Sequence, residues 1–79
     1  MKVHVHVFLK PGVLDVQGKA IEGALHSLGF PAAGNVRVGR VIELELEGAD
    51  AAGAEAQARQ MAERLLANPV IESYRVEAG

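Results

Sequence analysis

The side chains that could do chemistry in this 79-residue chain are few, and the histidines are the first to consider. His4 and His6 alternate within an apolar segment, so both imidazoles would lie on one side of a β-strand, about 7 Å apart. Two imidazoles can serve as metal ligands, but a zinc site needs at least three protein ligands and the sequence shows no convincing third. We therefore interpret this pair as a half-exposed strand face or an interface, with a metal carrier as an alternative.

Charged side chains form two further groups. Glu43, Glu45 and Glu47 share one face of a predicted strand, where they could bind a hard cation or simply meet solvent or arginine across a strand pair. Arg37 and Arg40 lie close together, and guanidinium groups suit bidentate recognition of carboxylate or phosphate. We predict that the two arginines contact a partner, with ordinary surface charge as the alternative.

The sequence lacks the groups of a self-contained enzyme. It contains no nucleophile elbow, Walker A loop or dinucleotide-binding glycine pattern. Cysteine and threonine are absent, and the only serines are Ser27 and Ser73. A nucleophile, a base and an oxyanion donor around one pocket would be hard to assemble from this set. We expect no catalytic residue and no cofactor or metal bound by this chain alone.

Size and charge limit the other classes of function. A chain this short buries only about 60% of its unfolded surface, and without cysteine it has no disulfide to compensate, so oligomerisation is expected. The net charge of −2 and the presence of only three aromatic residues argue against nucleic-acid binding. No apolar run approaches the roughly 20 residues that span a bilayer, and the N-terminus does not resemble a signal peptide. We expect a cytoplasmic protein.

The first half of the chain predicts a strand followed by a helix. Val3, Val5, Val7 and Leu9 alternate with other residues, and Pro11-Gly12 ends this strand. Asp15 is placed to cap a helix that stops at Gly29. The spacing within this helix predicts a buried stripe of four apolar residues, namely Ile21, Ala24, Leu25 and Leu28.

Residues 35–47 allow two interpretations. Alternation of apolar and polar residues continues through Gly39, which favours one long strand, about 40 Å in length, bent at that glycine. The alternative is a hairpin with a turn at Gly39, which would give a ferredoxin-like βαββαβ order. In the long strand Arg40 falls on the apolar side, so it would need a partner or an exit to solvent.

The second half predicts another helix and a last strand. Asp50 can cap a helix over residues 51–67, with a buried stripe of Ala54, Ala58, Met61, Ala62 and Leu65. Residues 70–77 then read as a strand. The predicted fold is a single α+β domain over residues 1–79, in the order β-α-β-α-β. Two helices would cover one face of an antiparallel sheet that dimerisation completes.

Three segments, in order, resemble one known family. Val13-Leu14-Asp15-Val16-Gln17-Gly18-Lys19-Ala20 is similar to the segment Val-Leu-Asp-Pro-Gln-Gly-x-Ala that is typical of PurS proteins. Residues 36–40 running into Glu43-Leu44, and residues 65–72 followed by Tyr74, resemble the same family. Val16 replaces the usual proline, so the first helical turn lacks the backbone angle that proline fixes.

This resemblance implies the small subunit of phosphoribosylformylglycinamidine synthase, which acts in purine synthesis. In that family the small subunit, itself a dimer or tetramer, bridges a large synthetase subunit that uses ATP and magnesium and a glutaminase subunit. We infer a candidate partner interface from the first two matching segments, consisting of Asp15, Gln17, Gly18, Arg37, Gly39 and Arg40. The alternative function is a ferredoxin-like regulatory module that binds a small molecule at its 11–18 loop.

Overall fold

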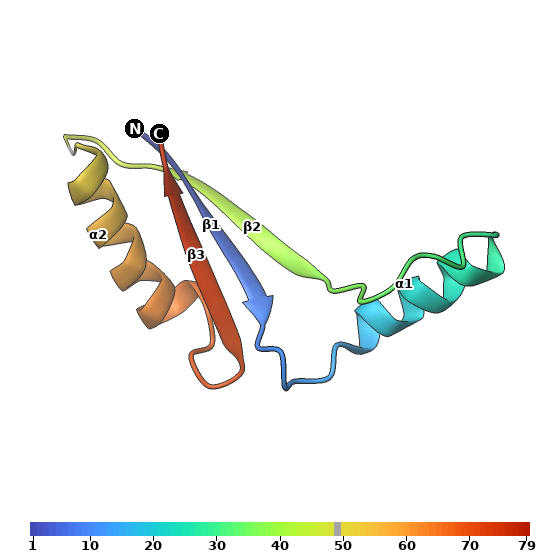
Figure 1. Ribbon diagram of the computed structural model, residues 1–79. Helices are drawn as coiled ribbons and strands as arrows, with labels where there is room; N and C mark the ends of the chain where they lie inside the picture. Colours follow the sequence, from blue (N-terminus) through green and yellow to red (C-terminus); the bar gives the residue numbers. More distant parts are fainter. Residues whose placement is uncertain (49) are drawn as a thin grey trace.

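The computed structural model describes residues 1–48 and 50–79, and it confirms the α+β class and the β-α-β-α-β order (Figure 1). The elements are β1 (Lys2–Leu9), α1 (Val16–Ser27), β2 (Gly39–Glu45), α2 (Ala51–Met61) and β3 (Glu72–Ala78). A short π-helical turn, η1 (Ala62–Leu66), continues α2. None of the helices in the described residues is both long and apolar enough to cross a membrane.

The sheet has three antiparallel strands in the order β2-β1-β3, with the N-terminal strand at its centre. Val3, Val5 and Val7 are fully buried on one face of β1, as the alternation in the sequence predicts. Their cross-strand neighbours continue this apolar face, because Val5 pairs with Ile42 on β2 and with Val76 on β3. The central strand therefore provides the largest buried side chains of the core.

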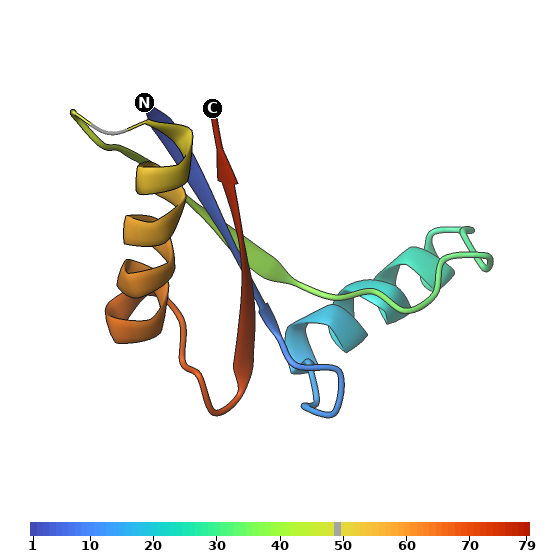
Figure 2. The same ribbon diagram turned by 60° about the vertical axis from the view of Figure 1, so that its left-hand side comes forward.

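Helix α2 covers this face of the sheet and packs against β1 and β3 (Figure 2). Its fully buried residues are Ala54 and Ala58, and Ala62 at the start of η1 continues the same stripe. Because alanine side chains are short, the helix lies close to the valines of β1. The Asp50 carboxylate caps the first turn by accepting a hydrogen bond from the amide of Gly53 (2.7 Å), as expected.

The end of the second helix differs from the prediction. Leu65 was expected in the buried stripe but is 83% exposed, whereas Leu66 is half-buried and Ala67 is buried. The π-helical turn explains this shift, because its wider turn moves the inward position one residue along the chain. The last strand also begins at Glu72 rather than at residue 70.

The predicted long strand over residues 35–47 is wrong at its N-terminal end, and the hairpin alternative is not formed. Strand β2 begins at Gly39 and lies at an edge of the sheet. Residues 33–38, which we call the strap, run along α1 before the strand begins (Figure 1). A side chain at position 39 would overlap the Phe8 ring, which explains a glycine at this point.

The prediction that both helices cover one face of the sheet is also wrong. Helix α1 projects beyond the end of the sheet, and we call α1 together with its strap the arm (Figures 1 and 2). The radius of gyration is 15.7 Å, whereas about 12 Å is expected for a compact chain of this length. Two residues of the predicted buried stripe, Ile21 and Leu28, are 40% and 72% exposed. Their apolar surface is left uncovered by their own chain.

Candidate partner-binding site at the base of the arm

The structure brings together the six residues that the sequence suggests as a partner interface. They lie where β1, α1, the strap and β2 meet. Four of them, Asp15, Gln17, Gly39 and Arg40, line one hollow of about 310 Å³. A second hollow of about 500 Å³ includes Asp15 and Arg37 in its lining, together with Phe8 and Lys19. Both hollows lie at the base of the arm.

Asp15 joins the two sides of the arm. One carboxylate oxygen accepts a hydrogen bond from the amide of Gly18 (2.8 Å), which caps α1 as predicted. The other accepts from the amide of Val38 (2.6 Å), at the end of the strap. The hydrogen bond from Val38, followed by that from Gly18, lowers the pKa of Asp15. With 4% of its surface exposed, Asp15 is the buried charged residue of the described chain.

Gly18 allows the strap to approach the helix. A Cβ atom at this position would overlap the Val36 carbonyl oxygen and the Asp15 carboxylate. The other glycine of this helix differs, because a Cβ atom at Gly23 would meet nothing within 4 Å.

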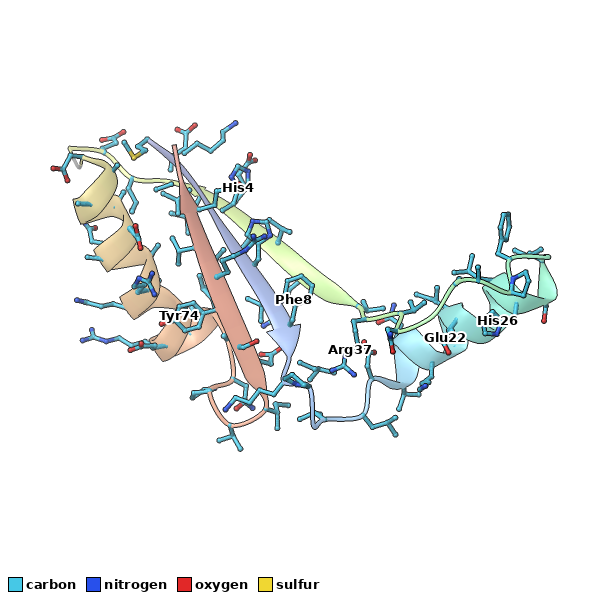
Figure 3. All side chains as sticks on the ribbon, viewed as in Figure 1. His4, Phe8, Glu22, His26, Arg37 and Tyr74 are labelled. Atoms are coloured by element: carbon cyan, nitrogen blue, oxygen red, sulfur yellow. The ribbon has the colours of Figure 1, made fainter. Side chains whose placement is uncertain are left out.

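Two further side chains attach the strap to α1. The Glu22 carboxylate accepts a hydrogen bond from the amide of Val36 (3.1 Å), and this contact is the main reason that the pKa of Glu22 is lowered. One turn later the Nε2–H of His26 donates to the carbonyl oxygen of Ala33 (2.6 Å). Both side chains are shown on α1 in Figure 3. The sequence alone does not predict this role of His26.

Asp15, Gly18, Glu22 and His26 therefore form one line along the helix, which we call the polar stripe. Their separations of three, four and four residues place them on a single helical face. This spacing is visible in the sequence, but it becomes informative only when the strap is known to lie against it. The helix thus presents polar groups to its own chain and apolar groups outward, which is the reverse of the predicted orientation.

Arg37 supports the turn that leads into the arm. Its guanidinium group donates hydrogen bonds to the carbonyl oxygens of Lys10 (3.1 Å), Val13 (3.2 Å) and Leu9 (3.3 Å) (Figure 3). These oxygens belong to the end of β1 and the loop before α1. Arg37 therefore stabilises the base of the arm, and its remaining exposed surface is open to a partner.

Arg40 finds its partner within the chain. Its guanidinium group donates to both carboxylate oxygens of Glu72 (2.7 and 3.2 Å) and to the carbonyl oxygen of Leu66. Glu72 also accepts from the amide of Asn68 (2.7 Å), and the Arg40 contact contributes most to its lowered pKa. The sequence had identified Arg40 as a charge on the apolar side that needs a partner. The bidentate ion pair with Glu72 compensates the charge of Arg40 and connects β2 to the start of β3.

The histidine pair lies on the face of the sheet opposite to α2. The ring centroids of His4 and His6 are 6.5 Å apart, and His4 Nε2 is 3.1 Å from a carboxylate oxygen of Glu43. Lys2 also pairs with Glu43 (3.4 Å) and is the main cause of its lowered pKa. Within residues 1–48 and 50–79 no cluster of three metal-ligating side chains is formed. This part of the chain therefore offers no support for the metal-carrier alternative.

Comparison with known proteins gives a consistent result along the whole chain. The family model described as PurS: Phosphoribosylformylglycinamidine (FGAM) synthase matches residues 2–79. The phosphoribosylformylglycinamidine synthase subunit PurS of Bacillus subtilis is 46% identical over 76 residues, which are 96% of this chain and 89% of the relative.

Solved structures agree with the sequence match. A crystal form of Bacillus subtilis PurS superposes with a TM-score of 0.85 at 45% identity, covering 99% of this chain and 96% of that chain. A chain in the structure of PurLQS from Thermotoga maritima gives a TM-score of 0.88 at 31% identity, with 99% and 95% covered. The projecting arm thus belongs to a fold that recurs in related proteins.

Proposed function

The chain belongs to the PurS family of phosphoribosylformylglycinamidine synthase subunits, and from this membership we propose that it is a non-catalytic assembly subunit of that glutamine-dependent ligase. In this role it bridges a large synthetase subunit and a glutaminase subunit, which together convert formylglycinamide ribonucleotide to formylglycinamidine ribonucleotide. ATP and magnesium bind to the large subunit rather than to this chain. The proposal places the complex in the cytoplasm.

The observation that carries this proposal is the exposed apolar side of α1. A helix in a small domain normally turns its apolar side toward its own core. Here the polar stripe faces the strap, while Val16, Ile21 and Leu28 remain exposed. An apolar helix face that its own chain leaves uncovered is typical of a protein-binding surface. We place the partner contacts on this arm and around the hollows at its base.

The total surface supports association with at least one further chain. The accessible surface is 5410 Å², whereas a compact monomer of this mass would expose about 4,600 Å². The excess of about 800 Å² is close to the share that one partner contributes to a standard interface, also about 800 Å². The edges of β2 and β3 are also unpaired in the described chain. We therefore propose a homo-oligomer, with sheet edges and the arm as its contact regions.

A reconstitution experiment tests the assembly role. The chain is mixed with the synthetase and glutaminase subunits from the same source, with glutamine, ATP and magnesium, and the mass of the complex is measured together with glutamine-dependent synthase activity. We expect a complex containing all three proteins, and loss of glutamine-dependent activity when the chain is omitted. Full activity and a stable two-subunit complex without the chain would contradict the bridging role.

The 500 Å³ hollow gives some support to the alternative of a small-molecule-binding module. Its lining combines apolar residues with Lys19, Glu22 and Arg37, as ligand pockets commonly do. Calorimetric titration of the purified chain with glutamine, ATP and formylglycinamide ribonucleotide separates the two functions. A saturable signal with the isolated chain would favour the module, whereas binding that appears only in the complete complex favours the assembly subunit.

A further inference from the structure

The polar stripe determines which side of α1 faces away from the chain. Three of its members contact the strap at successive points, namely Asp15 with Val38, Glu22 with Val36 and His26 with Ala33. Successive residues of an α-helix are 100° apart, so contacts at three levels allow only one rotation of the helix about its axis. The strap would lose these bonds together if α1 turned by one residue.

The side of α1 opposite to the strap is uncharged. Its exposed residues are Val16, Gln17, Ala20, Ile21, Gly23, Ala24, Ser27 and Leu28, which we call the outer face. The charged residues of the helix, Lys19 and Glu22, lie toward the strap and approach each other to 3.9 Å. No charge on the outer face would therefore repel the same face of an identical chain.

We propose that Asp15, Glu22 and His26 are positioning residues that orient the outer face of α1 for contact with a second copy of this chain. The inference rests on the homo-oligomer of the proposed function. Two features favour a second copy of the chain as the molecule that binds the outer face. A face without charges can meet itself across a two-fold axis without repulsion, and the excess surface of the chain is close to one partner's share of a standard interface. The small side chains at positions 20, 23 and 24 also allow close approach of another backbone.

Variants at Glu22 test the positioning role. Glu22→Met removes the acceptor for the Val36 amide and keeps the length of the side chain, whereas Glu22→Gln keeps an acceptor oxygen and removes the charge. Sedimentation velocity over a range of concentrations gives the dissociation constant of the full chain and of each variant. We expect Glu22→Met to raise this constant at least tenfold and Glu22→Gln to leave it within about threefold.

A second measurement separates a misdirected arm from a misfolded chain. Amide hydrogen exchange should become faster at Val36 in Glu22→Met, while the amides of β1 stay protected, since the sheet core does not involve Glu22. His26→Leu removes the donor to Ala33 and provides an independent variant with the same expected direction. Wild-type association in both Glu22→Met and His26→Leu would overturn the positioning role, as would equal weakening by Glu22→Met and Glu22→Gln.

A variant on the outer face tests whether a second copy of the chain binds there. Ala24→Glu places a carboxylate on that face and leaves the polar stripe intact, so we expect the oligomer to dissociate while the Val36 amide stays protected. An unchanged mass for Ala24→Glu would show that this face is not the contact, and the inference would fail. A wild-type chain that is monomeric at all concentrations would overturn the homo-oligomer itself, a result distinct from any effect of the variants.

Discussion

Replacing Gly18 by alanine should destabilise the arm, although alanine is the better helix former. Gly18 lies inside α1, so the substitution alone would favour the helix by about 1 kcal/mol. The added Cβ atom, however, would overlap the Val36 carbonyl oxygen, which is backbone and cannot rotate away. Overpacking of this kind costs about 1–3 kcal/mol. Relief requires the strap to move, which would lengthen the hydrogen bonds at Val36 and Val38.

Gly23→Ala provides a matched control, because Gly23 lies in the same helix and has open space where the methyl group would go. Both variants gain the same helix propensity, so the difference between their free energies of unfolding isolates the clash, at about 1–3 kcal/mol. Urea unfolding is followed by circular dichroism at 222 nm. The wild-type chain and both variants are compared at a concentration where sedimentation shows the same oligomeric state for each, since association shifts apparent stability.

Equal stability of Gly18→Ala and Gly23→Ala would refute the close approach of strap and helix. A clash confined to the arm should also leave exchange of the β1 amides unchanged in both variants. Loss of protection throughout the sheet in Gly18→Ala would mean that the arm and the sheet unfold as one unit, which the separation of α1 from the core does not predict.

Three further predictions concern the core, the helix end and pH. Val5→Ala should lower the free energy of unfolding by about 2–3 kcal/mol, because it removes buried methyl groups and leaves a cavity between β1 and α2; a loss below 0.5 kcal/mol in urea unfolding would contradict this placement. Leu65→Ala should change stability by less than about 0.5 kcal/mol and Leu66→Ala by about 1–2 kcal/mol, whereas the reverse order would contradict the π-helical turn. Asp15 and Glu22 have lowered pKa values in the folded chain, so both stabilise the folded state above their unfolded pKa values. This stabilisation is lost as the pH falls through their folded pKa values. The protection of the Val36 amide, which is its exchange rate compared with the intrinsic rate at the same pH, should therefore decrease below about pH 4, and unchanged protection down to pH 2 would contradict this.

The sheet and the caps could be predicted because their signals are local. Alternation along β1 identifies Val3 and Val5 as core, since a strand has only two faces and the other carries histidines. Asp15 and Asp50 precede helical segments and cap them as expected. In the candidate site, the local signal identified Asp15 as a helix cap but not the arm to which it belongs.

The orientation of α1 could not be predicted, because periodicity shows that a helix has an apolar side but not which chain covers it. Ile21 and Leu28 have the spacing of core residues, yet their own sheet is out of reach. The strap was equally hidden, since Val36 and Val38 continue the alternation of a strand. Their backbone amides bond to carboxylates of α1 rather than to a neighbouring strand, a choice that depends on tertiary structure.

The position of the first strand at the centre of the sheet has a consequence for the folding reaction. Strand β1 pairs with β3 along nearly its whole length, so Val3 meets Ala78 from the opposite end of the chain. Such non-local pairing raises the contact order and slows folding relative to helical proteins of the same size. The arm joins segments that are much closer in sequence, with Asp15 and Val38 separated by 23 positions. The smaller entropy cost of closing the shorter loop therefore favours formation of the arm before the sheet. The surface that contacts other chains would then form earlier than the core of the sheet.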